Sequence, residues 1–371
     1  MKTFLDLIEE VQKPGLCHHC GGCVTFCTSI NYGALELDPD TGMPRFGEKE
    51  KCIECGLCYA ICPEINELEE ETHKKVSWEP PIGKVIEVTT ARSIDVSLRS
   101  HATDGGVVTA LLLHLLKAGR IDGAIVTRQT GPFHREPFLA TTEEEIRSSA
   151  GFYFDTSQGI KHYSHDYSTY SPSVQEFRPM IEKGLHRIAL VGTPCQIKAV
   201  RKIETLGIVP SDSIKFCFGL FCSGNFFFGE EERKKLEEIG KFQLEDLKKV
   251  NVKEDFIVHL NSGKTLTLPL KKLDFMKRYA CRYCKDYSAE YADISFGGIG
   301  SKEGFTTVIT RSPIGRAIFA DAKGKTIEVL AGNIGFEENA SKTHEKVRAA
   351  SSLKKKQAEE NHKKLEKKKK W

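Results

Sequence analysis

The chain has 371 residues, of which 40% are hydrophobic and 28% are charged. This composition is ordinary for a globular protein of two or three domains, and it excludes a wholly disordered chain, a collagen-like chain and a protein built of many membrane spans. The net charge of +3 is unevenly distributed: residues 354–371 hold nine lysines and three glutamates, so the rest of the chain carries −3.

The N-terminal segment predicts a short acidic helix over residues 3–12. It has no apolar run followed by a small-residue cleavage site, so it does not read as a secretory signal. The longest apolar stretch, residues 107–116, is shorter than the roughly 20 residues that a transmembrane helix needs. We therefore expect a cytoplasmic protein without a transmembrane segment.

Eight of the thirteen cysteines repeat one spacing, CxxCxxCxxxC. The runs are Cys17, Cys20, Cys23, Cys27 and Cys52, Cys55, Cys58, Cys62. This is the spacing of bacterial two-cluster ferredoxins, in which the fourth cysteine of each run ligates the other [4Fe-4S] cluster. We therefore predict one cluster on Cys17, Cys20, Cys23 and Cys62 and a second on Cys52, Cys55, Cys58 and Cys27. Zinc knuckles and a disulfide framework are the alternatives; zinc favours paired CxxC motifs, and a chain without an export signal disfavours disulfides.

Residues 1–66 hold five basic and ten acidic side chains, so an electron-transfer partner with a basic face would suit this module. The polar segment 67–84 follows and carries Pro80 and Pro81, which restrict the backbone. We expect a linker there, separating a small ferredoxin domain from a larger one.

Residues 85–335 alternate short β-branched runs with helical patterns, which predicts a mixed α/β domain. The expected strands are 85–90, 124–127, 188–193, 214–221 and 293–296. Residues 256–270 predict a hairpin that turns at 261–264, so at least part of the sheet is expected to be antiparallel.

Five further cysteines lie in this larger domain. Cys195 and Cys222 each follow an expected strand, and Cys281 and Cys284 form a CxxC motif. Thiolates at neighbouring strand ends together with a CxxC motif favour a metal site, of which a four-iron cluster is one form. Half of a structural zinc site and buried thiols that pack as small hydrophobic groups are the alternatives.

Several motifs of the larger domain together resemble the beta subunit of hydrogenases that reduce the deazaflavin coenzyme F420. In chain order they are ARS (91–93), DGG (104–106), VGTPCQ (191–196), FCxxNF (221–226), CRYCKDY (281–287), ADxSFGGIGS (292–301) and TTVITR (306–311). The resemblance spans roughly residues 85–320. With a two-cluster module in front, the chain is similar to the electron-input subunits of F420H2 dehydrogenases of methanogenic archaea and to F420-linked subunits of formate dehydrogenase. The resemblance implies one FAD and a third [4Fe-4S] cluster on Cys195, Cys222, Cys281 and Cys284, which leaves Cys217 as a core residue.

An FAD also follows from the chemistry that this resemblance implies, because reduced F420 donates two electrons at once and each cluster accepts one. The sequence has neither the register of a dinucleotide-binding glycine motif nor a P-loop. We place the flavin at a helix start, where Asp104 would cap the helix and Gly105 and Gly106 would present amides to a phosphate, with Thr109 beside them. A plain capped amphipathic helix is the alternative.

The matched motifs supply further candidates for contact with the flavin or the deazaflavin. A second glycine-rich turn holds Gly298, Gly300 and Ser301, for which a simple tight turn is the alternative. Asn225, Lys285 and Thr306 are the remaining candidates. Residues 150–159 are expected to line the access route of the coenzyme, and the histidines of segment 161–167 are expected to lie in an exposed polar loop rather than at a catalytic or metal site.

Residues 336–371 predict a charged helix or a disordered tail. A solvated charge run is the commoner case; docking on a partner subunit, which we favour, or on anionic lipid is the other. We expect no nucleic-acid partner, because the rest of the chain is net negative and lacks a recognition fold.

The resemblance as a whole implies an F420H2 dehydrogenase. In it, F420 and FAD exchange hydride, and three clusters pass single electrons to a partner subunit or a ferredoxin. Peripheral association with a membrane dehydrogenase complex is one form of that partnership. The alternatives are an F420-linked subunit of a formate dehydrogenase or hydrogenase, a ferredoxin-dependent pigment reductase of the same family, and a non-catalytic iron–sulfur relay.

Overall fold

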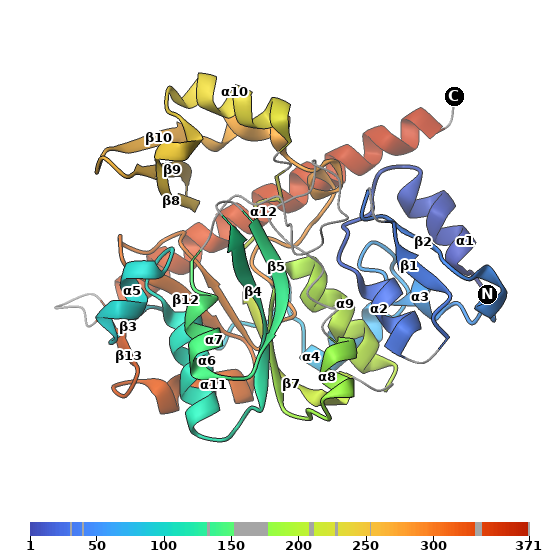
Figure 1. The fold of residues 1–371 in the computed structure, drawn as a ribbon, viewed down its shortest axis with the longest axis horizontal. Helices are drawn as coiled ribbons and strands as arrows, with labels where there is room; N and C mark the ends of the chain where they lie inside the picture. Colours follow the sequence, from blue (N-terminus) through green and yellow to red (C-terminus); the bar gives the residue numbers. More distant parts are fainter. Residues whose placement is uncertain are drawn as a thin grey trace.

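The computed structural model describes residues 1–29, 32–38, 41–131, 134–151, 177–207, 211–226, 229–252, 254–330 and 336–369. Within these residues, a cysteine-rich N-terminal module lies against a large domain built on one wide sheet, and a smaller sheet with one helix projects from that domain (Figure 1). The mixed α/β class with an N-terminal ferredoxin-like module is as predicted.

The N-terminal module consists of short elements, and its helical start agrees with the predicted acidic helix. Its elements are α1 (Phe4–Leu7), a π-helical turn (Ile8–Gln12), α2 (Gly22–Ser29), β1 (Leu35–Leu37), β2 (Pro44–Phe46), a 3-10 turn (Lys49–Lys51) and α3 (Leu57–Ala60). Thr3 and Asp6 form a reciprocal capping box at the start of α1. Phe26 and Ile61 of the module pack into a core that is shared with the large domain, so the two parts are joined by apolar packing as well as by the chain.

The segment expected to be a linker contains a helix that was not predicted, α4 (Glu69–Val76). Three glutamates fill the first turn of α4 and His73, Lys74 and Lys75 fill its last turn, so opposite charges stand four residues apart and complement the helix dipole. The helix packs on the large domain, where the hydroxyl groups of Thr72 and Thr205 lie 3.3 Å apart.

The large sheet has eight strands in the order β13-β3-β12-β11-β7-β6-β4-β5. Their bounds are β3 (Glu87–Ser93), β4 (Gly123–Gly131), β5 (His134–Ala140), β6 (Ile188–Gly192), β7 (Ile214–Leu220), β11 (Ile294–Gly297), β12 (Thr306–Thr310) and β13 (Ile327–Val329). The four central strands β11, β7, β6 and β4 are parallel, and the outer ones pair antiparallel. All five expected strands are present within one or two residues of the predicted starts.

Helices cover both faces of the large sheet, because its central strands are apolar on both sides. The helices are α5 (Val96–His101), α6 (Val107–Lys117), α7 (Glu143–Ser148), α8 (Phe177–Glu182), α9 (Pro194–Thr205) and α11 (Pro313–Ala322). In β4, Ala124 and Val126 pack with α6 and α11, whereas Ile125 packs with α9 on the opposite face.

The smaller sheet contains the predicted hairpin. It comprises β8 (Leu247–Val252), β9 (Asp255–Leu260) and β10 (Thr265–Pro269), all antiparallel, with α10 (Glu230–Gly240) packed against it. Short 3-10 turns (Ser211–Ser213, Leu244–Asp246, Leu270–Met276 and Tyr279–Arg282) complete the described elements of this half of the chain. The sheet encloses an apolar core of its own, centred on Val250, Phe256 and Val258.

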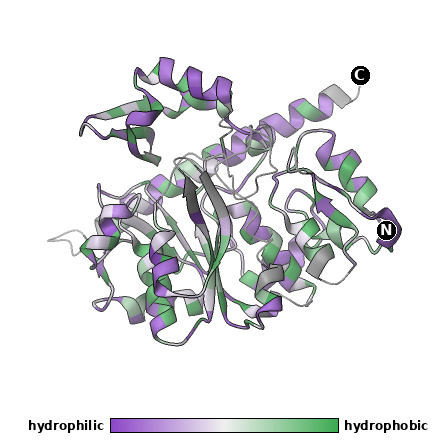
Figure 2. Ribbon diagram, viewed as in Figure 1, coloured by the Kyte–Doolittle hydropathy of each residue, from purple (hydrophilic) through white to green (hydrophobic). Residues whose placement is uncertain are grey.

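The chain ends in one long helix, α12 (Phe336–Lys369), which is the helical alternative of the sequence prediction. Figure 1 shows α12 running behind the large sheet toward the N-terminal module, and Figure 2 shows that it is mostly hydrophilic. Among the described residues, no helix combines the length and the apolar character needed to cross a bilayer.

Candidate functional site

The cysteines of the two N-terminal runs line two separate cavities of about 30 Å³ each. The Cys20 cavity is lined by Cys17, Cys20, Cys23 and Cys62, and the Cys55 cavity is lined by Cys27, Cys52, Cys55 and Cys58. The fourth cysteine of each run thus lies with the first three of the other run. This grouping fits two crossed four-cysteine ligand sets.

Glycine allows the loops to curl around these cavities. Gly21 and Gly56 adopt left-handed backbone conformations, with φ of 78° and 70°. A Cβ atom on Gly56 would lie 2.6 Å from the carbonyl oxygen of Lys2, so no larger residue fits there without movement of the chain. The loop that carries Cys55 and Cys58 therefore depends on this glycine.

Burial disfavours the charged form of these thiols. It raises the pKa of Cys17 and of Cys58 to about 12, and it raises the pKa of Cys23 and of Cys62 above the ordinary thiol value, with neighbouring cysteines adding to the shift. The thiolate is nevertheless the form that binds metal. These sites therefore fit a bound group that brings positive charge, which an iron–sulfur core does.

Four cysteines of the large domain come from three separated segments. Cys195 lies in the first turn of α9, Cys222 lies two residues beyond β7, and Cys281 and Cys284 lie in and after the 3-10 turn Tyr279–Arg282. The backbone N–H of Asn225 donates to Sγ of Cys281 at 3.2 Å, and the Sγ atom of Cys284 lies 3.5 Å from the carbonyl oxygen of Asp286. We call these four residues the third cysteine group.

The members of the third cysteine group lie within electrostatic reach of one another and of the N-terminal module. Burial is the main cause that raises the pKa of Cys195, and Cys20, Cys284 and Cys222 add to it in that order. Burial also raises the pKa of Cys222 to about 11, with contributions from Cys281 and Cys284. The helix α9, which carries Cys195, also packs beside the Cys20 cavity: a Cβ atom on Gly22, which lines that cavity, would lie 3.2 Å from the Cβ atom of Ala199.

No group of three or more His, Cys, Asp or Glu side chains in the described ranges is arranged to hold a single metal ion. The cysteine spacing, the two cysteine-lined cavities and the grouping of the four cysteines of the large domain instead favour polynuclear clusters.

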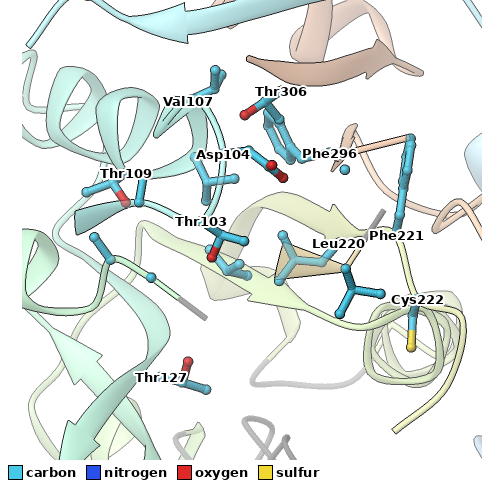
Figure 3. Close-up of a pocket in the computed structure, with 18 of the residues that line it drawn as sticks. Thr103, Asp104, Val107, Thr109, Thr127, Leu220, Phe221, Cys222, Phe296 and Thr306 are labelled. Carbon is cyan, nitrogen blue, oxygen red and sulfur yellow. The ribbon is translucent and has the colours of Figure 1, made fainter. Parts of the chain in front are cut away.

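A larger cavity of about 230 Å³ opens at the carboxyl ends of the parallel strands, and we call it the strand-end cavity. Val126 and Thr127 of β4, Val191 of β6, Leu220 of β7 and Phe296 of β11 contribute to its wall. This edge is where open α/β sheets commonly bind ligands. Figure 3 shows Asp104, Thr306 and Phe296 on one side of the cavity and Cys222 at its edge, beside Phe221.

Six of the ten residues predicted to contact flavin line the strand-end cavity: Asp104, Gly106, Thr109, Asn225, Gly298 and Thr306. A seventh, Gly105, lies directly behind this wall, where its backbone N–H donates to Oγ1 of Thr306 at 3.0 Å. A Cβ atom on Gly105 would lie 2.7 Å from the carbonyl oxygen of Ala91, so the loop packs closely on β3. Segments about 200 residues apart are thereby joined at one wall of the cavity.

Two details of the predicted helix start are wrong. Gly106, with φ of 71°, is the N-cap residue of α6, and Asp104 therefore does not cap this helix. The amide of Gly105 is bonded to Thr306 and is not directed at a phosphate. The first turn of α6 has no side-chain cap, however, and residues 106–109 face the cavity. We predicted that the amides of Gly105 and Gly106 would face a phosphate. In the structure, the N–H groups of the first turn of α6 lie at the cavity instead.

Three other candidates lie away from the strand-end cavity. Lys285 is exposed. The carbonyl oxygen of Gly300 accepts a hydrogen bond from Thr343 of α12, and Ser301 donates to carbonyl oxygens within its own turn, which is the tight-turn alternative. Cys217 is fully buried inside β7, in the apolar core. The predicted access route (150–159) and polar loop (161–167) lie outside the described residues, apart from residues 150 and 151, which line the cavity.

Sequence reasoning missed the aromatic wall of the strand-end cavity. Phe221, Tyr287 and Phe296 all line it, and the rings of Phe221 and Tyr287 lie 5.7 Å apart. Each of them belongs to a motif that also carries a predicted site residue, so their position beside those residues was the available signal. Thr127 shows a second signal, because it is a polar residue directly after the apolar run 124–126 of a buried parallel strand.

Comparison with known proteins agrees with this geometry. Residues 88–163 and 185–332 match the N-terminal and C-terminal family models of the coenzyme F420 hydrogenase/dehydrogenase beta subunit, and residues 9–63 match a 4Fe-4S dicluster domain. The coenzyme F420 hydrogenase subunit beta of Methanothermobacter thermautotrophicus is 31% identical over 271 residues, which are 70% of this chain and 91% of that protein.

Two further relatives extend the comparison. A subunit of the F(420)H(2) dehydrogenase of Methanosarcina mazei is 28% identical over 319 residues, 84% of each chain. A chain of the F420-reducing [NiFe] hydrogenase complex from Methanosarcina barkeri superposes with a TM-score of 0.66 at 27% identity, covering 77% of this chain and 94% of that one. The protein belongs to the family of coenzyme F420 hydrogenase/dehydrogenase beta subunits and carries an N-terminal 4Fe-4S dicluster domain.

Proposed function

We propose that the protein is an F420-linked oxidoreductase of the F420H2 dehydrogenase type. In this proposal F420 and an FAD exchange hydride at the strand-end cavity, and single electrons pass through three [4Fe-4S] clusters to a partner. The observation that carries the proposal is the order of the sites. Cys222 belongs both to the wall of the cavity and to the third cysteine group, and Cys195 of that group lies on α9, whose Ala199 packs against Gly22 of the Cys20 cavity.

The strand-end cavity has the features that a flavin requires. The uncapped first turn of α6 directs N–H groups and the positive end of its dipole into the cavity, which suits a phosphate. Val107, Leu220 and Phe296 offer an apolar surface to a ring system, while Thr127 and Asn225 supply polar groups. When bound, FAD links the two-electron chemistry of a hydride donor to the one-electron chemistry of iron–sulfur clusters.

The residues of the cavity act by positioning rather than by acid or base chemistry. Hydride transfer between two rings requires them to be close and aligned, and binding in a shaped apolar site supplies that order in advance. Phe221 and Phe296 contribute flat surfaces, and the bond between Gly105 and Thr306 fixes the loop that carries Asp104. The apolar lining also excludes water from the reacting rings.

The N-terminal module provides the exit in this scheme, because the Cys55 cavity lies near a surface that contains apolar side chains. Tyr32 and Ile53, which line that cavity, are exposed, with 38% and 59% of their surfaces accessible. The module around them is acidic overall. We propose that a cytoplasmic partner subunit or ferredoxin with a basic rim docks here, including, in one form, a subunit of a membrane-associated dehydrogenase.

Anaerobic mixing of the reconstituted protein with reduced F420 and a one-electron dye tests the proposal. The expected result is that reduced F420 bleaches the flavin and the dye is then reduced. If the dye stays oxidised with F420 although NADPH or a reduced ferredoxin bleaches the flavin, the deazaflavin assignment is wrong. About eight irons per chain and no flavin would favour a non-catalytic relay.

A further inference from the structure

The C-terminal helix α12 is bound to both parts of the protein, although its sequence reads as a charged tail. Its buried positions recur every three or four residues: Thr343, Val347, Ser351, Lys354 and Ala358. Val347 packs with Ile82, Val88 and Ile309 of the large domain. Further along, Leu365 packs on the apolar core of the N-terminal module. One face of α12 is thus a core-facing stripe.

Lys354 is the one residue in this stripe that carries a full charge. Only 8% of its surface is exposed, whereas Lys356 on the same helix faces solvent. Its ammonium group donates to the carbonyl oxygen of Cys222 at 2.7 Å and to that of Asp286 at 2.8 Å. Both acceptors belong to segments that carry the third cysteine group, so α12 places a positive charge beside that group.

The charges around Lys354 explain why a lysine is tolerated at this buried position. A cubane with four thiolate ligands carries a net negative charge, and the hydrogen bonds of Lys354 go to the segments that would hold this cluster. These hydrogen bonds to Cys222 and Asp286 go to carbonyl oxygens rather than to a carboxylate. The cluster proposed for the third cysteine group would therefore supply the compensating negative charge.

A fixed buried cation has a definite effect on a redox group. A cubane with four thiolate ligands is negatively charged, and reduction adds one more negative charge. In a low-dielectric environment a nearby positive charge stabilises the more negative state. We infer that Lys354 sets the reduction potential of the cluster proposed for the third cysteine group, by stabilising its reduced form; this inference rests on the three-cluster function proposed above.

The inference assigns a role to α12 in the electron path. The third cysteine group contributes Cys222 to the strand-end cavity, and its Cys195 lies on α9, which packs beside the Cys20 cavity. Raising the potential at this station favours acceptance of an electron from the cavity side. Lys354 acts through the cluster and touches neither substrate nor flavin in this arrangement, so it is a positioning residue for charge and not a catalytic one.

Redox titration of the reconstituted holoprotein, followed by electron paramagnetic resonance, tests this role. In Lys354→Gln, which keeps an N–H donor, and in Lys354→Met, the ratio of reduced to oxidised third cluster at a fixed potential should fall by about tenfold, which for a one-electron couple is about 59 mV. Lys356→Gln removes the same charge from the same helix at an exposed position and should leave the ratio unchanged. Loss of the signal in Cys281→Ser identifies the third cluster.

Each outcome bears on the inference. A lowered potential in both Lys354 variants, with iron content equal to that of the unmodified protein, supports it. An unchanged potential, or loss of the third cluster's iron in both variants but not in Lys356→Gln, overturns it and leaves Lys354 with a structural role only. If the unmodified protein shows no third cluster at all, the three-cluster function itself fails, which is a different result from an unchanged potential.

Discussion

The cysteines of the N-terminal module and those of the large domain are brought together in different ways. In the module, eight cysteines within 46 residues line two cavities, and the spacing of each run nearly determines its site. In the large domain, the third cysteine group is assembled from α9, the end of β7 and a loop about 60 residues further along. The cysteines of the module are close together in the sequence, whereas those of the large domain are brought together by the folding of the sheet.

The sites of the N-terminal module and of the large domain therefore depend on different structural features. The two sites of the N-terminal module depend on single glycines and on the fourth cysteine of each run, which lines the cavity of the other run. The third cysteine group depends on the parallel pairing of β6 and β7, which places the following segments with Cys195 and Cys222 at one edge, and on the 3-10 turn that brings Cys281 and Cys284 to them.

The largest effect is expected when two ligands are removed from the module. If the crossed grouping is correct, Cys62→Ser combined with Cys20→Ser damages one cluster, because both residues line the Cys20 cavity. Cys62→Ser combined with Cys55→Ser damages two, because Cys55 lines the other cavity. Iron analysis should show losses of about four and about eight irons, respectively. The reverse pattern would mean that each run holds its own cluster.

A smaller but still severe effect is expected in the large domain. Cys281→Ser should remove about four irons. It should slow electron delivery to an external dye by on the order of a hundredfold, because loss of one redox station interrupts transfer, while reduced F420 still bleaches the flavin. Cys217→Ser is the matched control, since Cys217 is buried inside β7 away from the cysteine groups. Iron content that stays constant in Cys281→Ser would argue against a cluster there.

The contrast between local and assembled sites also explains what could be predicted. The eight-cysteine spacing requires only a short stretch of chain, so the grouping around both cavities follows from it. The strand positions could be predicted as well, because their apolar runs are continuous. For the third cysteine group, the strand-end thiols and the CxxC motif favour a metal site, but the family resemblance was needed to assign a four-iron cluster to these four residues, because they come from segments far apart in the chain.

The errors arose where distant segments decide local structure. Asp104 precedes a helix and looks like a cap, but Gly106 is the N-cap, and Gly105 is held by Thr306, 201 residues further along the chain. The helix over residues 69–76 was not predicted, although glutamates four residues before basic side chains favour one. That signal is local.

The smallest predicted effect concerns the wall of the strand-end cavity. Thr306→Val removes the acceptor of the Gly105 amide and leaves a buried donor without a partner, at a cost of about 1–3 kcal/mol. Because this bond positions the loop before α6, the dissociation constant of FAD should rise by about tenfold, which equilibrium dialysis or fluorescence measures.

Thr310→Val is the control for this change. Thr310 is fully buried on the same strand, and its hydroxyl has no hydrogen-bond partner among the described residues. The substitution should therefore leave flavin affinity as it is. Equal losses of affinity in both variants would show that the strand, and not the bond to Gly105, governs the cavity.

A stepwise titration with reduced F420 tests most directly whether electrons pass from a flavin to the clusters. Reduced F420 is added in small, known amounts to the anaerobically reconstituted protein, and flavin absorbance and the cluster signals are recorded on the same samples. Every molecule of reduced F420 that is oxidised should place two electrons in the protein, shared between the flavin and the clusters. A protein that holds no flavin, or that oxidises F420 without any cluster becoming reduced, would contradict this expectation.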